Sequence, residues 1–337
     1  MQIKTPSAAT TAAVSKKQLS DTSTVQRRLP NITADAWFAE GNRVSYDCKG
    51  SRILQSGEED HASDIVQVFH RITEAVGVKS DATWTSFLPG WPDGSYGCSK
   101  VDQCLAGDDI GPRLFVEYVG HGDSDKPAQY PYSTMERADI VEAAWLSKKI
   151  TSTFIVGSDY SSIVALELLA RQQDRRETGT EPTTRIEGVL LINGGLYADG
   201  HTHPWFTTPI LKSALGGLVT ALAQRSKLIF AELVKPLWSK GFPVQRAEMD
   251  ELYKAINRRN GVVAISKSAK FVDQHKQHAK RLNLSRLYHA SRDLVSFHVI
   301  GSDNDPFERR QAELAQKRLG DQGLDIRIIP GGHLATS

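Results

Sequence analysis

The sequence lacks three features that would each define a class of protein. It contains no run of about 18 apolar residues, so it predicts no membrane span. Its 41 basic and 39 acidic residues leave a formal charge of only +2, which provides no global field for binding nucleic acid. Its three cysteines, Cys48, Cys98 and Cys104, have neither metal-ligand spacing nor the pattern of a disulfide framework. These absences favour a small-molecule role in a reducing compartment, and we predict a cytoplasmic protein.

The N-terminal stretch has a composition of its own. Residues 1–20 are rich in Ala, Ser and Thr and contain lysines but no acidic residue. Such a segment fits an organelle transit peptide, and it fits a disordered tail equally well. We predict a disordered tail over residues 1–35.

Short apolar runs alternate with helical patterns along the rest of the chain. Residues 43–57 have the pattern of a hairpin, and residues 61–77 have apolar residues at helical spacing. Further strands are expected in residues 83–97, 113–127, 151–159, 186–195, 294–306 and 324–333, and helices in 133–149, 161–173 and 307–319. This alternation predicts an α/β fold with a mostly parallel sheet flanked by helices. A mainly helical block, residues 199–290, interrupts it and is expected to be an insertion.

A tight turn is expected where the strand before Asp159 passes into a helix. Small residues stand two positions before and after the aspartate, at Gly157 and Ser161. A sharp strand-to-helix turn requires small flanking residues, because its backbone packs closely while the central side chain projects outward. Ser158 is out of register with that central position and is a poor nucleophile candidate. Asp159 could be a helix cap or a nucleophile.

Polar residues also follow two later strands. Asp303 and Asp305 come after one strand, and His333 comes after the last. In an open α/β sheet, catalytic groups gather outside the carboxyl ends of the strands. Either aspartate alone could be a turn former. Together with the histidine they favour the nucleophile interpretation of Asp159 over the cap, because caps do not predict such partners.

Seven sequence motifs in this order resemble one superfamily. They are FLPGWPDG, GHGDSDKP, YSTMERADIVEA, VGSDYSS, LLINGGLY, GSDNDP and PGGHLATS. The chain resembles the α/β-hydrolase superfamily, and within it the aspartate-nucleophile branch of epoxide hydrolases and haloalkane dehalogenases, especially the mesoderm-specific-transcript-like proteins. The resemblance covers over half of the chain.

The resemblance implies roles for the polar residues at the strand ends. Asp159 would attack a saturated carbon and form an alkyl-enzyme ester. His333 would activate the water that hydrolyses this ester, with Asp305 as its supporting carboxylate and Asp303 as the alternative acid.

Further roles follow from the same resemblance. The backbone N–H groups of Trp91 and Tyr160 would form an oxyanion hole. The family protonates the departing alkoxide with tyrosines of its cap. By position the candidates here are Tyr253, then Tyr197 and Tyr288.

The sequence departs from the family pattern in three places. Pro89 replaces the usual histidine before the loop glycine, which affects the expected shape of the oxyanion hole. Tyr160 stands where dehalogenases commonly have a halide-binding tryptophan, so epoxide hydrolysis ranks above dehalogenation. The chain ends at Ser337, where the family continues into a closing helix, and we therefore expect His333 to be loosely held.

Four of the five histidines in the inserted block form two close pairs in the sequence. His201 and His203 form an H-x-H pair without a third ligand at a supporting spacing, so we interpret them as hinge residues and predict no metal site. His275 and His278 belong to a basic stretch that is expected to be a solvated helix face.

We therefore predict a tail (1–35), a hydrolase core in two parts (36–198 and 291–337) and a helical cap (199–290). The predicted activity is hydrolysis of a small apolar substrate, an epoxide, without metal or organic cofactor. A haloalkane dehalogenase, an ester or lactone hydrolase, and a non-catalytic binding or regulatory protein are the alternatives. The sequence does not fix the oligomeric state.

Overall fold

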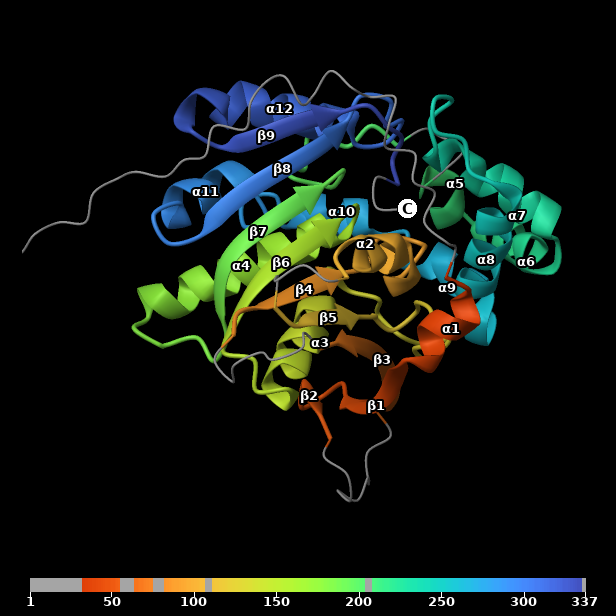
Figure 1. Ribbon diagram of the computed structural model, residues 1–337, viewed down its shortest axis with the longest axis horizontal. Coiled ribbons are helices and arrows are strands. Elements are labelled where there is room, and N and C mark those ends of the chain that lie inside the picture. The colour runs from red at the N-terminus through yellow and green to blue at the C-terminus, as the bar shows by residue number, and fades with distance from the viewer. Residues whose placement is uncertain (1–31, 55–63, 75–81, 107–110, 204–207, 335–337) are drawn as a thin grey trace, which may run out of the picture. The chain divides into compact units, whose positions relative to one another are not determined.

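A computed structural model describes residues 32–54, 64–74, 82–106, 111–203 and 208–334 (Figure 1). Most of the expected tail lies outside these ranges, although helix α1 already begins at Ala34. The described residues contain nine strands of one sheet. The strands are β1 Gly41–Asp47, β2 Arg52–Ile53, β3 Ile65–Thr73, β4 Trp84–Leu88, β5 Arg113–Val116, β6 Ser152–Ser158, β7 Arg185–Ile192, β8 Ser296–Ser302 and β9 Asp325–Ile329.

The strands lie in the order β2-β1-β3-β5-β4-β6-β7-β8-β9. Strands β5, β4, β6, β7, β8 and β9 pair in parallel, whereas β2, β1, β3 and β5 pair antiparallel. The mostly parallel sheet flanked by helices confirms the predicted fold class. Because β4, β6, β8 and β9 run in the same direction, their carboxyl ends lie along one edge of the sheet (Figure 1).

Helices separate the strands as the sequence pattern predicted. They are α1 Ala34–Ala39, α2 Ser99–Cys104, α3 Thr134–Ser147, α4 Ser161–Glu177, α5 Thr208–Lys212, α6 Gly216–Arg225, α7 Lys227–Val234, α8 Arg246–Asn257, α9 Gly261–Ser268, α10 Phe271–Gln277, α11 Leu284–Ser291 and α12 Arg309–Leu319. Local sequence explains where α3 begins, because the Ser133 hydroxyl accepts a hydrogen bond from the Met135 N–H.

The predicted helix within residues 61–77 is wrong, because this segment contains strand β3. The spacing of Ile65, Val68, Phe69 and Ile72 suits a helix face, but β3 pairs with β1 on one side and with β5 on the other. Side chains on both of its faces are buried. A strand buried on both faces carries apolar residues without alternation, and such a run resembles a helical pattern.

Two apolar clusters form the core. In the first, helices α3, α4, α11 and α12 pack against the sheet. In the second, α1 packs with helices α6 to α9 and with aromatic residues of the sheet, including Phe87 and Phe115. The helical block between β7 and β8 therefore divides: α11 packs against α4, whereas α5 to α9 extend beyond the strand ends (Figure 1). We call residues 208–268 the α5–α9 segment. Among the described helices, none is long and apolar enough to cross a membrane.

Candidate active site

The turn at Asp159 has the strained geometry expected of a sharp strand-to-helix connection. Strand β6 ends at Ser158, Asp159 has a φ of 50°, and α4 begins at Ser161. The left-handed region is costly for residues other than glycine. The turn is held by the Asp159 N–H, which donates to the Ile192 carbonyl at 2.7 Å. A Cβ at Gly194 would lie 2.2 Å from the Asp159 carbonyl oxygen, so β7 can pack beside this turn only with glycine there.

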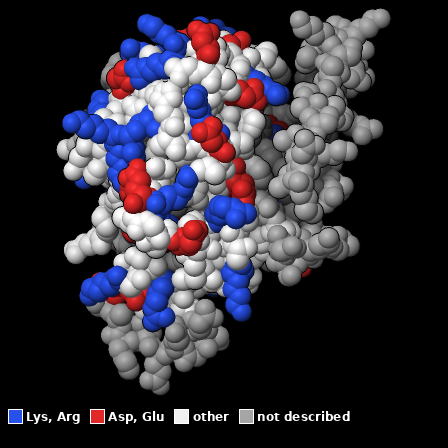
Figure 2. Space-filling view, turned by 90° about the vertical axis from the view of Figure 1, so that its left-hand side faces the viewer, with Lys and Arg blue, Asp and Glu red and all other residues white. Residues whose placement is uncertain are grey.

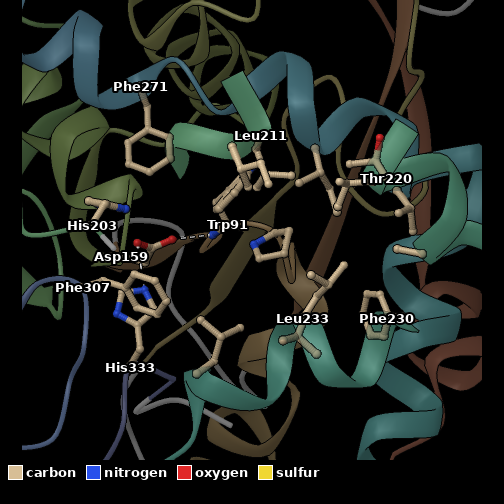
Figure 3. A pocket seen from close by; sticks show the side chains of 18 residues that line it. Trp91, Asp159, His203, Leu211, Thr220, Phe230, Leu233, Phe271, Phe307 and His333 are labelled. Carbon is tan, nitrogen blue, oxygen red and sulfur yellow. Dashed lines mark hydrogen bonds and ion pairs between the residues drawn. The ribbon is translucent and has the colours of Figure 1, made fainter. Parts of the chain in front are cut away.

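Three of the side chains predicted at the strand ends meet at this turn, and Figure 3 shows two of them, Asp159 and His333. His333 Nε2 lies 3.0 Å from Asp159 Oδ1, and His333 Nδ1 lies 2.9 Å from Asp305 Oδ2. The Trp91 backbone N–H donates to the other Asp159 oxygen at 2.8 Å. All three ionisable side chains are buried. The arrangement is a chain of carboxylate, imidazole and carboxylate, with a backbone N–H on the first carboxylate.

Asp305, and not Asp303, is the carboxylate beside His333. The other oxygen of Asp305 accepts the backbone N–H groups of Phe307 and Glu308, at 2.8 and 3.1 Å, which fix its orientation. Asp303 is exposed, and it accepts a hydrogen bond from the Gly331 N–H at 3.1 Å. The alternative acid is therefore turned away from the site.

His333 is firmly held, which corrects the expectation of a loose position. Its N–H donates to the Leu237 carbonyl at 2.8 Å, and its carbonyl accepts from Asn193 Nδ2 at 2.8 Å. Asn193 also accepts the Ser302 N–H at 2.7 Å, so one side chain joins the ends of β7 and β8 to the loop after β9. The sequence analysis did not single out Asn193.

The electrostatics of the chain favour a charged imidazole. Burial alone would lower the pKa of His333, but the Asp305 and Asp159 carboxylates outweigh it and raise that pKa well above its ordinary value. Burial raises the pKa of Asp159, an effect that His333 and the Trp91 N–H oppose. Because His333 lies between two carboxylates, the arrangement favours the protonated imidazole.

The loop after β4 keeps its position despite the unusual Pro89. The Ser161 hydroxyl donates to the Pro89 carbonyl, and the Tyr118 hydroxyl lies 2.9 Å from the same Ser161 oxygen. This anchor brings the loop against the first turn of α4. The Trp91 N–H consequently reaches Asp159. Tyr160, which carries the other predicted oxyanion donor, follows Asp159 directly, and its side chain packs against Tyr118.

Asp159 and His333 face an apolar pocket (Figure 3). Besides Trp91 with its indole N–H, four of the described lining residues carry polar groups in their side chains. They are Asp159, His203, Thr220 and His333. The others are Trp91, Pro92, Ile210, Leu211, Val219, Ala223, Phe230, Leu233, Val234, Leu237, Val262, Ile265, Phe271 and Phe307. Most come from the α5–α9 segment, so this segment covers the carboxyl edge of the sheet. The pocket suits an apolar ligand.

None of the three predicted tyrosines lies among the described residues that line this pocket. The Tyr253 hydroxyl donates to the Gln224 carbonyl at 2.5 Å. The Tyr288 hydroxyl donates to a backbone carbonyl beyond α12, and Tyr197 bonds to a serine of α11. Position in the chain was the only guide to these residues, and their hydroxyl groups are engaged elsewhere.

Instead, the pocket contains a histidine that the sequence analysis had interpreted as a hinge. His203 lines the same pocket as Asp159 (Figure 3). Its Nε2 lies 2.8 Å from Glu308 Oε1, and the same oxygen lies 2.7 Å from His201 Nδ1. His201 Nε2 in turn lies 2.8 Å from His275 Nδ1. His275 is buried, so its expected place on a solvated face is wrong.

Hydrogen-bond partners assign the protons of this histidine cluster. His275 Nε2 lies 2.8 Å from the Leu282 carbonyl and must donate to it. Burial lowers the pKa of His275 to about 4, so the ring is neutral and its Nδ1 accepts from His201. Burial would raise the pKa of Glu308, but hydrogen bonds from His201 and His203 lower it to about 2. The Glu308 carboxylate therefore accepts hydrogen bonds from both His201 and His203.

The same groups could be ligands for a metal. His201, His203 and Glu308 offer ligand atoms within 4.8 Å of one another, and Glu308 Oε2 has no hydrogen-bond partner among the described residues. Two ligands of a tetrahedral zinc ion are about 3.3 Å apart. The observed nitrogen–oxygen distances of 2.7 and 2.8 Å are those of hydrogen bonds. In this arrangement protons, rather than a cation, join the three side chains.

Solved structures with the same fold include hydrolases of three kinds. Epoxide hydrolase CorEH matches with a TM-score of 0.55 and 15% identity, over 88% of this chain and 93% of that one. Haloalkane dehalogenase DbeA from Bradyrhizobium elkani matches with a TM-score of 0.59 and 18% identity, over 80% and 89%. An esterase from Exiguobacterium antarcticum matches with a TM-score of 0.55 and 16% identity, over 81% and 90%. This protein has the α/β-hydrolase fold.

A curated relative agrees with the resemblance stated from the motifs. The human mesoderm-specific transcript homolog protein is 26% identical over 220 residues. The match covers 64% of this chain and 63% of the relative, so the chain spans less than two thirds of that protein's length. No family model matches the sequence.

Proposed function

We propose that this α/β-hydrolase opens epoxides of small apolar molecules through a covalent ester on Asp159. The single observation that carries the proposal is the contact of the Asp159 carboxylate with both His333 and the Trp91 N–H at the mouth of an apolar pocket. A carboxylate held in this way can act as a nucleophile toward carbon. The likeness in fold to an epoxide hydrolase supports this chemistry.

In the first step, an Asp159 oxygen attacks a ring carbon of the epoxide. A carbon–oxygen bond to Asp159 forms, the ring carbon–oxygen bond breaks, and its electron pair remains on the departing oxygen. That oxygen needs a proton, and no tyrosine lines the described part of the pocket. We propose that His203 in its doubly protonated form supplies the proton from its other nitrogen, because its ring lines the same pocket as Asp159 (Figure 3) and its Nε2–H stays bound to the Glu308 carboxylate.

In the second step, water attacks the carbonyl carbon of the ester. Ester formation removes the negative charge of Asp159, one of the causes that raise the pKa of His333, and the imidazolium releases its proton to solvent. The neutral imidazole, which Asp305 keeps oriented, then accepts a proton from the attacking water. The ester carbon–oxygen bond breaks, its oxygen takes this proton from His333, and the diol leaves. Asp159 gives up its carboxyl proton to return to the carboxylate form, and solvent reprotonates both histidines.

Halide release fits the pocket less well. The indole N–H of Trp91 is engaged by Ser268 Oγ at 2.8 Å, and Tyr160 is absent from the described pocket lining. A departing halide would therefore lack the pair of donors that dehalogenation requires. Hydrolysis of an ester or lactone uses the same nucleophile, and it remains the second candidate because an esterase shares the fold.

A single-turnover reaction in oxygen-18 water tests the covalent route. The protein is mixed with a smaller amount of an aryl-substituted epoxide, and the peptide containing Asp159 is then analysed by mass spectrometry. We expect one oxygen-18 atom in the Asp159 carboxylate and an unlabelled oxygen in the first diol. Diol formation without label in this peptide would contradict the mechanism. A folded protein that turns over neither epoxides, haloalkanes nor esters would instead support a binding role.

A further inference from the structure

Helices α6 and α7 expose an unusual amount of apolar surface. Seven of the eleven large hydrophobic side chains that are exposed among the described residues lie between positions 215 and 242. They are Leu215, Leu218, Leu222, Leu228, Ile229, Leu233 and Phe242, which we call the apolar patch. The most exposed is Leu228, at 81%. Single exposed leucines are ordinary, but a contiguous group of them indicates an interaction surface.

The two helices are apolar on their inner sides as well. Ala223, Phe230 and Val234 are buried and line the pocket beside Asp159. On α6, Leu218 and Leu222 are one turn apart and share the outer face. A helix that is apolar all round is normally covered on all sides. The described residues of the protein cover only the inner side.

Charge in this part of the chain has one predominant sign. Residues 210–246 contain six basic residues and one acidic residue, a net charge of +5 (6 − 1). Three of the basic residues form ion pairs, Lys212 with Asp273, Lys227 with Asp250 and Lys235 with Glu232, which leaves Arg225, Lys240 and Arg246. The whole chain has a formal charge of +2, so the remainder carries −3 (2 − 5). By contrast, the face in Figure 2, on the side of Figure 1 away from α6 and α7, has Lys and Arg intermingled with Asp and Glu. Apolar side chains among cationic ones are typical of protein surfaces that bind anionic lipid.

We propose that the apolar patch docks on an anionic lipid surface. Its leucines would enter the region between headgroups and acyl chains, and the neighbouring Lys and Arg side chains would contact the headgroups. A second copy of the chain is a poorer occupant, because a two-fold interface would bring two stretches of charge +5 together. Among the described helices none can span a bilayer, so the docking is peripheral.

The patch continues into the pocket. Leu233 is 46% exposed, and it also lines the pocket that contains Asp159. When the patch is docked, the side of the pocket that Leu233 lines faces the lipid surface. A substrate that dissolves in the lipid can then enter without crossing water. This last step rests on the proposed function, whereas docking itself does not.

Vesicle flotation tests the docking with matched variants. The full chain is floated with phosphatidylcholine vesicles that either contain or lack phosphatidylserine. We expect flotation with the anionic vesicles and its loss at high salt, because the ionic contribution is screened. The double variant Leu218→Asp/Leu228→Asp should bind at least roughly tenfold more weakly, because each leucine no longer transfers from water to lipid. The control Leu146→Asp changes a leucine that is 59% exposed on α3, and it should float like the wild type.

Two results would overturn the proposal. One is a wild-type protein that floats with neither kind of vesicle. This result counts against docking on lipid whether light scattering finds a monomer or a dimer that the double variant dissociates. The other is equal loss of flotation in the control and in the double variant. Hydrolysis of a water-soluble epoxide is measured on the same samples. Leu218 and Leu228 are not among the described residues that line the pocket. Flotation can therefore fail while hydrolysis persists, and hydrolysis can fail while flotation persists. The docking proposal and the proposed function are thus tested separately.

Discussion

Two imidazole–carboxylate pairs, His333 with Asp305 and His203 with Glu308, lie at the pocket of Asp159. They differ in the further ionisable partner that each pair contacts. His333 has a carboxylate on each side, Asp159 at 3.0 Å and Asp305 at 2.9 Å. In the other pair, one carboxylate, Glu308, is shared by two histidines. Two anions around one imidazole hold a proton on it until one anion is neutralised. Glu308, by contrast, is one anion that accepts hydrogen bonds from two imidazoles.

The two carboxylates of these pairs come from one short turn. Asp305 and Glu308 are three residues apart, and the Glu308 N–H donates to Asp305 at 3.1 Å. The position of one pair is therefore tied to that of the other. A single turn after β8 can therefore supply the orienting carboxylates for both a base and an acid.

The largest effect is expected from substitution of Asp159, the residue at the pocket that both pairs share. Asp159→Asn should reduce turnover by about four orders of magnitude or more, because an amide is a very poor nucleophile toward carbon. Epoxide hydrolysis is measured under steady-state conditions, and intact mass confirms that the asparagine has not deamidated. Ser158→Ala, one residue earlier at the same turn, should keep the wild-type rate. Equal loss in both variants would indicate damage to the turn rather than to the chemistry.

The next largest effect is expected from a substitution that breaks the His333–Asp305 pair. Asp305→Asn should slow ester hydrolysis by roughly 10²- to 10³-fold, because the imidazole loses the carboxylate that orients it and stabilises its charge. The alkylated protein should then accumulate and be visible by mass spectrometry during turnover. Asp303→Asn, in the exposed neighbour, is the matched control and should behave like the wild type. Accumulation in that variant instead would reverse our choice between the two acids.

A smaller effect is expected from the second pair. His203→Gln should slow formation of the ester by about 10²-fold, while the hydrolysis of preformed ester is unchanged. Rapid-mixing mass spectrometry separates the two rates. This split distinguishes the two histidines, because loss of His333 acts on the second step.

Two variants control for this experiment. His289→Gln changes an exposed histidine on α11 and should have no effect on either rate. Tyr253→Phe removes the hydroxyl that the sequence analysis favoured as the acid, and it should leave ester formation at its wild-type rate because that hydroxyl bonds to Gln224. A slow first step in Tyr253→Phe with a normal one in His203→Gln would assign the acid to the tyrosine.

The sequence predicts the pair of His333 and Asp305 but not the pair of His203 and Glu308, and the reason is physical. Asp159, Asp305 and His333 each follow a strand, and parallel strands bring their carboxyl ends to one edge. Periodicity locates strands, so it also locates these ends. His203 and Glu308 are 105 positions apart, and His203 belongs to a connection without regular pattern. A clue was present, since Glu308 follows Asp305 by three residues and His201-x-His203 is an uncommon pair, but spacing alone could not join them.

The same reasoning explains what was predicted of the fold. Parallel strands separated by helices were identified because each turn had small or polar residues. The error at β3 arose because side chains on both faces of this strand are buried, and burial on two faces removes the alternation that marks a strand.

The smallest expected effect concerns stability and pH. The folded pKa of His333 lies above its ordinary value of 6.5, so the folded protein binds the proton more tightly than the unfolded chain does. The resulting stabilisation is fully present below about pH 6.5, and it is lost as the pH rises through the folded pKa. Each unit of elevation contributes about 1.4 kcal/mol to the free energy of unfolding.

The measurement compares urea unfolding of the wild type and His333→Gln at several pH values above 6. The difference in free energy of unfolding should decrease as the pH rises. Glu308 does not contribute to this trend, because its pKa of about 2 is depressed and its stabilisation is lost only as the pH falls below about 4.5. A difference for His333→Gln that stays constant across this range would mean that the imidazole is neutral in the folded protein, and the contrast between the two pairs would no longer hold.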